Sequence, residues 1–412
     1  MMLTGAASSL LKLNTFNSLS NPNFRWLWLG VMGSFSAMQM QVIARGWLVY
    51  TMTSSPLALG AVSAAWGLAV LAFSPFGGAI ADRVDKRGLL IVTQSLLGAT
   101  ALVIAVLVAA DLIQLWHLIV TSIFTGLVFS FNMPARQALL PELVGKDDLM
   151  NAIALNSVAM NLMRIGAPAL GGILIGVTGV EGAYFFMVIS YSLVVGTLLM
   201  IKSPRTAHVQ EHLSLIRSMQ VGVQYIRSNQ ILIVLLVMAL VPITLAMPYV
   251  TLMPALAVDV LHLGSEGLGA LMAAAGVGAL IGSLFIASMG DFRRKGMLLL
   301  LASLGFGVAL LLLGLSRSFI LSLVFLLLAG AGGTGYMALN TTLLQTNIAD
   351  EVRGRVMSIY MMTWGLMPLG ALPAGAIAEA LGVPLTLSIG GATMALLTLA
   401  CAVAFPKLRQ LG

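Results

Sequence analysis

Apolar residues recur along the chain in stretches of about 20 or more, and each stretch ends at charged or turn-forming residues. A helix of about 20 apolar residues crosses the hydrocarbon layer of a bilayer, which is roughly 30 Å thick. The pattern predicts helices at 24–50, 57–81, 88–110, 112–135, 149–180, 182–201, 231–258, 267–290, 296–316, 318–347, 356–378 and 381–405. We therefore expect an all-α integral membrane protein with twelve transmembrane helices.

The longest polar stretch lies between the sixth and seventh predicted helices. It divides the chain into a six-helix bundle over 1–201, a connector over 202–230 and a second six-helix bundle over 231–412. Four apolar residues of the connector fall at the spacing of a helix lying on the membrane surface: Leu213, Ile216, Met219 and Val223.

The two halves repeat each other weakly. The segment that starts at Pro134 aligns with the one that starts at Ala338, at an offset of 204 residues, and 86–88 aligns with 294–296 at an offset of 208. Each offset is about half of the 412 residues, as two parallel repeats would give. We expect two pseudo-symmetric bundles that rock about a central site.

Composition agrees with a lipid environment. Charged residues make up 8% of the chain, against roughly a quarter in soluble domains, and the mean hydropathy is +1.02. Of the 21 lysines and arginines, 18 fall on the side of the membrane that holds the N-terminus. Cytoplasmic loops retain such residues, so both termini are predicted to lie in the cytoplasm. The predicted location is the inner or plasma membrane, which the chain crosses several times. The net charge of +7 then reflects topology and not nucleic-acid binding.

A charged loop follows the second predicted helix, with the sequence GGAIADRVDKRGLL over 77–90. It resembles the signature loop of the major facilitator superfamily, G-x-x-x-D-R-x-G-R-[RK], although Asp85 stands where many members have glycine. An aspartate at the end of its own helix is poorly placed for the helix dipole and should seek a partner elsewhere. The resemblance implies that Asp82 latches the outward-facing state by contacting the start of the eleventh helix, at 350–355. The alternative is that these charges only anchor the loop in the cytoplasm.

The latch prediction includes nine residues near that loop, the fourth helix and the eleventh helix: Gly78, Asp82, Arg83, Lys86, Arg87, Arg136, Glu142, Arg353 and Arg355.

Four segments resemble one branch of the superfamily, the enterobactin-exporter-like or transmembrane secretion effector group: 47–60, 134–144, 151–172 and 353–375. The third contains GAPALGG, similar to the G-P-x-x-G-G motif of exporters, with Ala167 where a glycine usually precedes the proline. Its small residues and proline favour a helix that bends and packs closely: Gly166, Pro168, Gly171 and Gly172. Mere helix packing explains this motif as well as export does.

Two arginines fall inside predicted helices, where a cation costs roughly 2.5–3.5 kcal/mol on insertion scales. Arg45 shares a helical face with Gln41 and Ser34, and Arg164 lies three residues after Asn161. A cavity beside Arg164 would need anionic or strongly polar contents. The alternatives are that Arg45 snorkels to the outer surface and that Arg164 makes a static bond between helices.

The superfamily resemblance implies that helices 1, 4, 7 and 10 line a central cavity. Polar and aromatic residues on the last three of these helices join Ser34, Gln41, Arg45, Asn161 and Arg164 as predicted lining: Asn132, Thr244, Tyr249, Tyr336 and Asn340.

The resemblance implies a secondary transporter, and we expect proton-driven export of a small amphipathic compound, siderophore-like or drug-like. No acidic residue falls mid-membrane, so the proton carrier is not identified, and no nucleotide-binding loop indicates direct ATP drive. We expect a monomer without metal or cofactor. The alternatives are an importer of a sugar or organic acid and a non-transporting sensor or scaffold. The scattered histidines argue against an intramembrane enzyme.

Overall fold

A computed structural model describes residues 18–81, 83–202, 215–289, 292–364 and 366–411. Within these ranges the chain forms helices and turns without β-strands. Ten of the described helices are long and apolar enough to cross a membrane, and a shorter apolar helix covers Gly370–Leu381. The prediction of an all-α integral membrane protein is confirmed, and the helices are consistent with twelve crossings.

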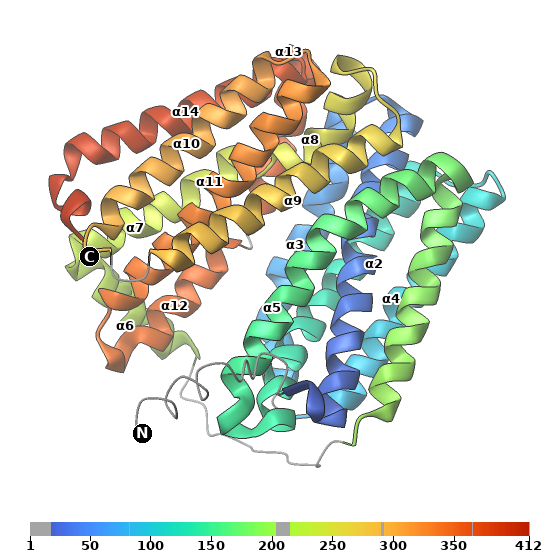
Figure 1. The fold of residues 1–412 in the computed structure, drawn as a ribbon, viewed down its shortest axis with the longest axis horizontal. Coiled ribbons are helices and arrows are strands. Elements are labelled where there is room, and N and C mark those ends of the chain that lie inside the picture. The colour runs from blue at the N-terminus through green and yellow to red at the C-terminus, as the bar shows by residue number, and fades with distance from the viewer. Residues whose placement is uncertain (1–17, 82, 203–214, 290–291, 365, 412) are drawn as a thin grey trace, which may run out of the picture.

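The first half of the chain, 18–202, contains four continuous elements: α2 (Pro22–Thr53), α3 (Pro56–Ala81), α4 (Lys86–Ala109) and α5 (Leu115–Met200). The 86 residues of α5 do not form one straight helix. Gly145 and Gly179 adopt φ values of 70° and 78°, which side-chain-bearing residues rarely adopt, and they divide α5 into three segments. The chain reverses at these breaks (Figure 1), so α5 supplies the fourth, fifth and sixth predicted helices.

The second half, 215–411, begins with the connector helix α6 (Leu215–Ser228). Eight further helices follow: α7 (Gln230–Val241), α8 (Tyr249–Ala255), α9 (Ser265–Ser288), α10 (Lys295–Leu315), α11 (Phe319–Thr346), α12 (Asp350–Trp364), α13 (Met367–Leu381) and α14 (Val383–Ala404). A π-helical segment at Pro242–Ala246 lies between α7 and α8, and another at Leu256–Val260 follows α8. A proline inside a helix lacks the N–H for the regular bond, and Pro242 and Pro254 lie in or beside these irregular turns.

Two predicted boundaries are wrong. The fourth helix was expected to end at residue 135, yet it continues to the break at Gly145 through Pro134 and Pro141. These prolines and the charges beside them look like a loop in sequence, but Arg136 finds hydrogen-bond acceptors inside the bundle. The eleventh helix was expected over 356–378, and the structure begins α12 at Asp350 and ends α13 at Leu381.

The connector helix forms as predicted, but it does not lie alone on a membrane surface. α6 packs on α12, and Tyr225 and Ile226 are partly buried against the core of the second half. The Tyr225 hydroxyl accepts a hydrogen bond from the Ala349 N–H at 3.3 Å. Leu213 lies outside the described residues.

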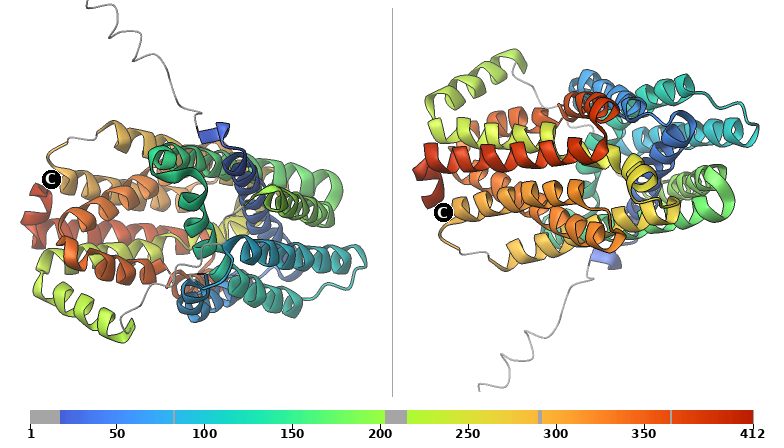
Figure 2. Two further views of the ribbon diagram at one scale, coloured as in Figure 1. Left: turned by 90° about the horizontal axis from the view of Figure 1, so that it is seen from below. Right: turned by 90° about the horizontal axis from the view of Figure 1, so that it is seen from above.

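The two halves lie side by side when the molecule is seen from below and from above (Figure 2). In the view of Figure 1 they converge at one end. We call the end that holds the connector helix the connector end. The opposite end holds the turns after Thr53 and after Leu315. The two ends differ in how the halves touch.

Toward the opposite end, a single apolar cluster includes buried residues of both halves, among them Met40, Tyr184, Leu256 and Phe306. Toward the connector end the buried core is divided. One cluster there contains only second-half residues such as Leu343, and two others contain only first-half residues such as Leu139 and Phe24. The halves therefore share a core at the opposite end and keep separate cores at the connector end.

Small residues let the halves approach closely where they share that core. A Cβ atom placed on Gly60 would lie 2.7 Å from the carbonyl oxygen of Ala371, and one placed on Gly172 would lie 2.5 Å from that of Ser265. These contacts join α3 to α13 and α5 to α9. Glycine is required at both positions because no side-chain carbon fits.

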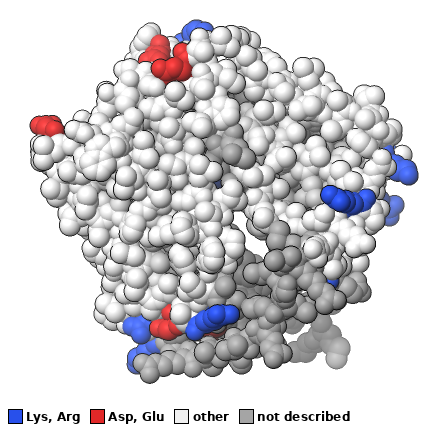
Figure 3. All heavy atoms as spheres, turned by 180° about the vertical axis from the view of Figure 1, so that it is seen from behind, with Lys and Arg blue, Asp and Glu red and all other residues white. Residues whose placement is uncertain are grey.

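Most charged groups in Figure 3 lie toward the top, the bottom and the right of the face shown, and most described atoms between them belong to uncharged residues. Large apolar side chains are exposed on the helices, for example Val177 of α5 at 75% and Val403 of α14 at 73%. In water such a surface would aggregate, whereas in a bilayer it contacts lipid chains.

Candidate functional site

Three polar contacts join the two halves at the opposite end. The Tyr50 hydroxyl on α2 donates to the carboxylate of Asp259. The Glu379 carboxylate on α13 accepts from the Ser55 hydroxyl at 2.8 Å and from the Leu57 N–H at 3.2 Å. Glu379 therefore lies at the N-terminus of α3, where a negative charge is favourable. These contacts and the shared core close the space between the halves at this end.

At the connector end, the bonds of Lys86, Arg87 and Glu142 lie within the first half. Asp85, which is beside the predicted latch residues but not one of them, caps α4 by accepting from the Gly88 N–H at 2.9 Å. Lys86 forms a salt bridge of 2.8 Å with Glu142, and Arg87 donates to the carbonyl oxygens of Leu198 and Leu199.

Of the other described latch residues, four lie at the end of α3, in the loop after it and on α12. Arg83 is exposed, Gly78 has open space beside it, and Arg353 donates to the Ile348 carbonyl oxygen at 3.5 Å. Arg355 is half-buried on α12. Asp82 lies outside the described residues, so its contact with the start of α12 stays a prediction.

Arg136 does not lie in a loop, because it belongs to a polar cluster inside the first half. Its Nη2 donates to the Ser34 hydroxyl at 2.7 Å and to the Asn132 Oδ1 at 3.2 Å. Gln94 Nε2 also donates to the Ser34 hydroxyl, at 2.9 Å, and Asn132 Nδ2 donates to Thr93 Oγ1 at 2.7 Å. We call these five residues the Ser34 cluster.

The Ser34 cluster has unsatisfied atoms. The Nε and Nη1 atoms of Arg136 and the Oε1 atom of Gln94 are buried without a hydrogen-bond partner among the described residues. The structure thus places Ser34 and Asn132 between α2, α4 and α5, and no contact recorded for them reaches the second half. Sequence reasoning missed Gln94 and Thr93, and the signal for Gln94 was an amide inside an otherwise apolar helix.

Arg45 is also held within the first half. Its Nη1 donates to the Ser122 hydroxyl at 3.0 Å. Ser122 is fully buried, so the guanidinium points into the bundle and not toward the outer surface. Gln41, one turn before Arg45, is half-buried.

Arg164 differs from the other two membrane-level arginines because it is exposed. Its guanidinium makes no hydrogen bond to any residue that the structure describes. Its backbone carbonyl oxygen would lie 2.9 Å from a Cβ atom on Gly276 of α9. Arg164 therefore lies where the two halves meet. Asn161, one turn away, donates to the Ser157 carbonyl oxygen at 3.0 Å.

The predicted lining residues of the second half lie mostly in its interior. The Tyr336 hydroxyl donates to the Met238 carbonyl oxygen, and Thr244 Oγ1 donates to the Leu240 carbonyl oxygen at 3.0 Å. Asn340 is fully buried, and neither polar atom of its side chain has a hydrogen-bond partner in the part of the chain that the structure describes. Tyr249 packs its ring against Phe306 and is partly exposed.

The helix-bend motif lies where α5 packs on α2 and α9. Gly171 faces Met40, and Gly172 faces Ser265 and Gly269. Pro168 is buried, and its carbonyl oxygen would lie 2.8 Å from a Cβ atom placed on Gly269. Gly166 has open space beside it. The motif therefore joins the two halves, as close packing requires.

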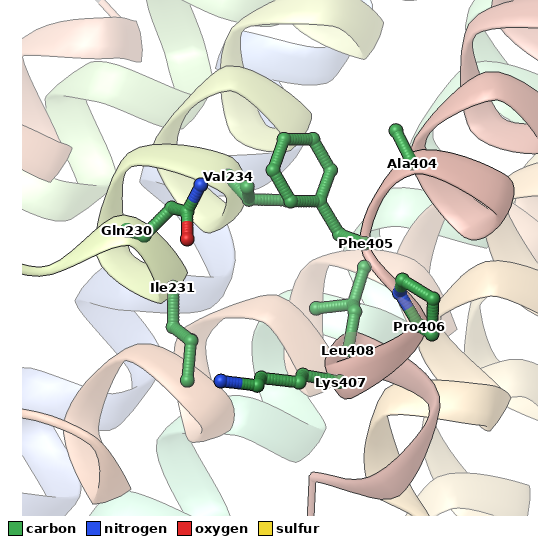
Figure 4. Close-up of a pocket in the computed structure, with 8 residues that line it drawn as sticks. All are labelled: Gln230, Ile231, Val234, Ala404, Phe405, Pro406, Lys407 and Leu408. Carbon is green, nitrogen blue, oxygen red and sulfur yellow. The ribbon is translucent and has the colours of Figure 1, made fainter.

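A shallow pocket lies elsewhere, where the start of α7 meets the end of the chain. Figure 4 shows Lys407 as its only charged residue, among the lining side chains Gln230, Ile231, Val234, Ala404, Phe405, Pro406 and Leu408. This pocket belongs to the second half alone and is not part of the space between the halves.

The chain is similar to known proteins over almost its whole length. The family model described as transmembrane secretion effector matches residues 13–411. The staphyloferrin A transporter of Staphylococcus aureus is 26% identical over 87% of this chain and 90% of its own length. The enterobactin exporter EntS of Shigella dysenteriae is 27% identical over 86% and 84%, and macrolide efflux protein A of Streptococcus pyogenes is 22% identical over 92% and 95%.

Solved structures share the fold. A POT family transporter in complex with 5-aminolevulinic acid matches with a TM-score of 0.75 and 12% identity, covering 93% of this chain and 96% of that one. A bacterial homologue of the human lysosomal transporter Spinster, in an inward-facing and unoccupied conformation, matches with a TM-score of 0.72 and 13% identity, covering 97% and 99%.

Proposed function

This chain belongs to the transmembrane secretion effector family of major facilitator transporters, and from that premise we propose that it exports a small amphipathic compound across the membrane. Its relatives include a staphyloferrin A transporter, an enterobactin exporter and a macrolide efflux protein, which supports a siderophore-like or drug-like substrate. The moving parts are the bundles 1–201 and 231–412, joined by 202–230, and the monomer is the working unit.

One observation carries this proposal: the halves share a core at the opposite end and have separate cores at the connector end. Each half can therefore rotate as a body, because its own connector-end core stays intact while the shared contacts change. A site between the halves is then exposed to the connector end in this conformation and to the opposite end after rotation. Alternating access of this kind is how secondary transporters work.

The connector end faces the cytoplasm in our proposal, because most lysines and arginines lie in the segments at that end. In that orientation the structure is the cytoplasm-open state, from which an exporter loads its substrate.

A labelling experiment tests the orientation. In a Cys401→Ser background, Asp111→Cys should react with a membrane-impermeant maleimide on intact cells, because Asp111 is exposed in a turn at the opposite end. Arg227→Cys, exposed on α6, should react only after the membrane is permeabilised. The reverse pattern would contradict the orientation.

Proton coupling is part of the proposal, since the sequence has no nucleotide-binding loop. Inside-out membrane vesicles from expressing cells should accumulate a fluorescent amphipathic dye when their interior is acidified. Vesicles from non-expressing cells serve as the control, and an ionophore that collapses the proton gradient should stop accumulation. Accumulation only in right-side-out vesicles would identify an importer and overturn the export direction.

A further inference from the structure

The pocket at the start of α7 has both apolar and polar walls. Most of its lining side chains are apolar, among them Val234, Phe405 and Leu408, and the two polar ones are Gln230 and Lys407. Its volume is about 190 Å³, which suits the headgroup of a lipid and not a whole lipid molecule. Figure 4 shows Lys407 extending toward the start of α7, so that its ammonium group lies on the same side of the pocket as the Gln230 amide.

The pocket lies where two apolar helices end. α14 ends at Ala404 and α7 begins at Gln230, and both residues line the pocket. The 22 residues of α14 rise roughly 33 Å at 1.5 Å per residue, about the thickness of the hydrocarbon layer. When α14 spans the bilayer, the pocket is therefore at the level of the lipid headgroups.

Exposed apolar side chains continue along both helices from the pocket. On α14 they include Leu396 and Val403, and on α7 they include Ile233 and Val237. In a bilayer such side chains contact acyl chains. A lipid whose headgroup enters the pocket thus has an apolar protein surface for its tails, which a free phosphate ion does not need.

Lys407 brings a positive charge that the described residues do not neutralise. It is exposed and forms no salt bridge or hydrogen bond within the described part of the chain. Arg409 donates from Nε and Nη2 to the Ala402 carbonyl oxygen, at 2.9 and 2.6 Å. Because the C-terminal end of a helix is negative, this contact reduces the repulsion that α14 would exert on an anion in the pocket.

α7 presents the opposite end of a helix to the pocket. The Asn229 Oδ1 atom accepts from the Ile231 N–H at 3.0 Å, which fixes where the helix begins. The N-terminus of a helix carries a partial positive charge and favours an anion. The helix end beside Gln230 and the ammonium group of Lys407 therefore attract the same kind of ligand.

Further basic residues lie near the pocket. The Gly296 N–H donates to the Leu411 carbonyl oxygen at 3.0 Å, which holds the start of α10 against the end of the chain. Arg293 and Arg294, just before α10, are exposed. α7, α10 and α14 contain no aspartate or glutamate. In Figure 3, which views the molecule from behind, basic side chains gather at the right, on the side of the C-terminus.

We propose that this pocket binds the headgroup of an anionic phospholipid, with the phosphate against Lys407 and the Gln230 amide and the tails along α7 and α14. Basic pockets between transmembrane helices bind such headgroups. A zwitterionic lipid also has a phosphate, but its cationic group would meet the basic residues without a carboxylate partner. The site lies in the second half alone, so it is independent of the direction of transport.

Binding of lipid to the purified full-length protein in an uncharged detergent, counted by native mass spectrometry, tests the site. Phosphatidylglycerol should bind about tenfold more tightly than phosphatidylcholine with the same acyl chains. Lys407→Gln should weaken phosphatidylglycerol binding about fivefold, the contribution of one basic residue near a membrane surface. Ala404→Trp should weaken it at least as much, because the indole fills the pocket without changing the charge.

Arg317→Gln is the matched control. It also removes one positive charge, but Arg317 lies at the opposite end and donates to the carbonyl oxygens of Gly314 and Ser316. This variant should bind phosphatidylglycerol as the wild type does. Melting temperatures without added lipid show whether each variant is folded.

Three results would overturn the inference. Equal affinity of the wild type for the two lipids would refute selection of an anion. Equal binding of phosphatidylglycerol by Lys407→Gln and Arg317→Gln would show that the lipid binds elsewhere. Inorganic phosphate that displaces the lipid at equal concentration would identify a site for the free ion and not for a phospholipid.

Discussion

Replacing Gly172 with valine should reduce transport at least tenfold in a protein that still folds and inserts. A Cβ atom at this position would lie 2.5 Å from the Ser265 carbonyl oxygen and 2.9 Å from the Gly269 Cα atom, both in the second half. Neither backbone can move aside without moving its whole helix, so the shared core at the opposite end cannot close. A rate loss of this size corresponds to about 1.4 kcal/mol or more.

The predicted cause can be measured directly. The Gly172→Val variant should be trapped with the opposite end open, so that a cysteine replacing Ala378, which is 3% exposed in the shared core, becomes accessible to a maleimide. Gly196→Val is the control, since Gly196 also lies on α5 and has open space beside it. Equal transport by the two variants would show that the contact does not limit closure.

Replacing Ser34 with alanine should lower the free energy of unfolding by about 2–4 kcal/mol, although only one oxygen atom is removed. That oxygen accepts hydrogen bonds from both Gln94 and Arg136. Without it, two buried donors lose their acceptor, and one of them is a cation that already has two unpaired nitrogens. Leaving a buried charged donor unsatisfied costs more than losing a bond at the surface.

Unfolding of the purified protein in detergent, followed by the loss of helical signal, measures the effect of Ser34→Ala. Ser74→Ala is the matched control, because the exposed Ser74 hydroxyl donates only to the Val70 carbonyl oxygen and should change stability by no more than about 0.5 kcal/mol. In a double-mutant cycle, Arg136→Met should remove most of the Ser34→Ala penalty. Equal stability of the two serine variants would refute the role assigned to the Ser34 cluster.

The membrane-spanning pattern could be predicted because it depends on local properties: length, apolarity and the charges at helix ends. The end of the fourth helix could not. Pro134, Arg136 and Pro141 together look like a loop, and the helix persists because Arg136 finds an acceptor on Ser34, 102 residues earlier. No local pattern contains that partner.

The candidate site shows the same limit. Arg45 and Arg164 are equivalent in sequence, since each is a single cation inside an apolar helix. Helix rotation separates them: the Arg45 side chain bonds to Ser122 within its own bundle, whereas the Arg164 side chain is exposed and its backbone meets Gly276 of the other half. Close glycine packing sets that rotation, and it depends on a helix more than 100 residues away in sequence.

The shared core has a consequence for how the protein is made. Its first-half and second-half residues are far apart in sequence; Tyr50 and Asp259, which join the halves, are 209 residues apart. At a synthesis rate of about 5–20 residues per second, the ribosome needs roughly 10–40 s to supply the second partner. During that time the first bundle resides in the bilayer with its partner face covered by lipid, and those lipid molecules must leave before the two halves can close.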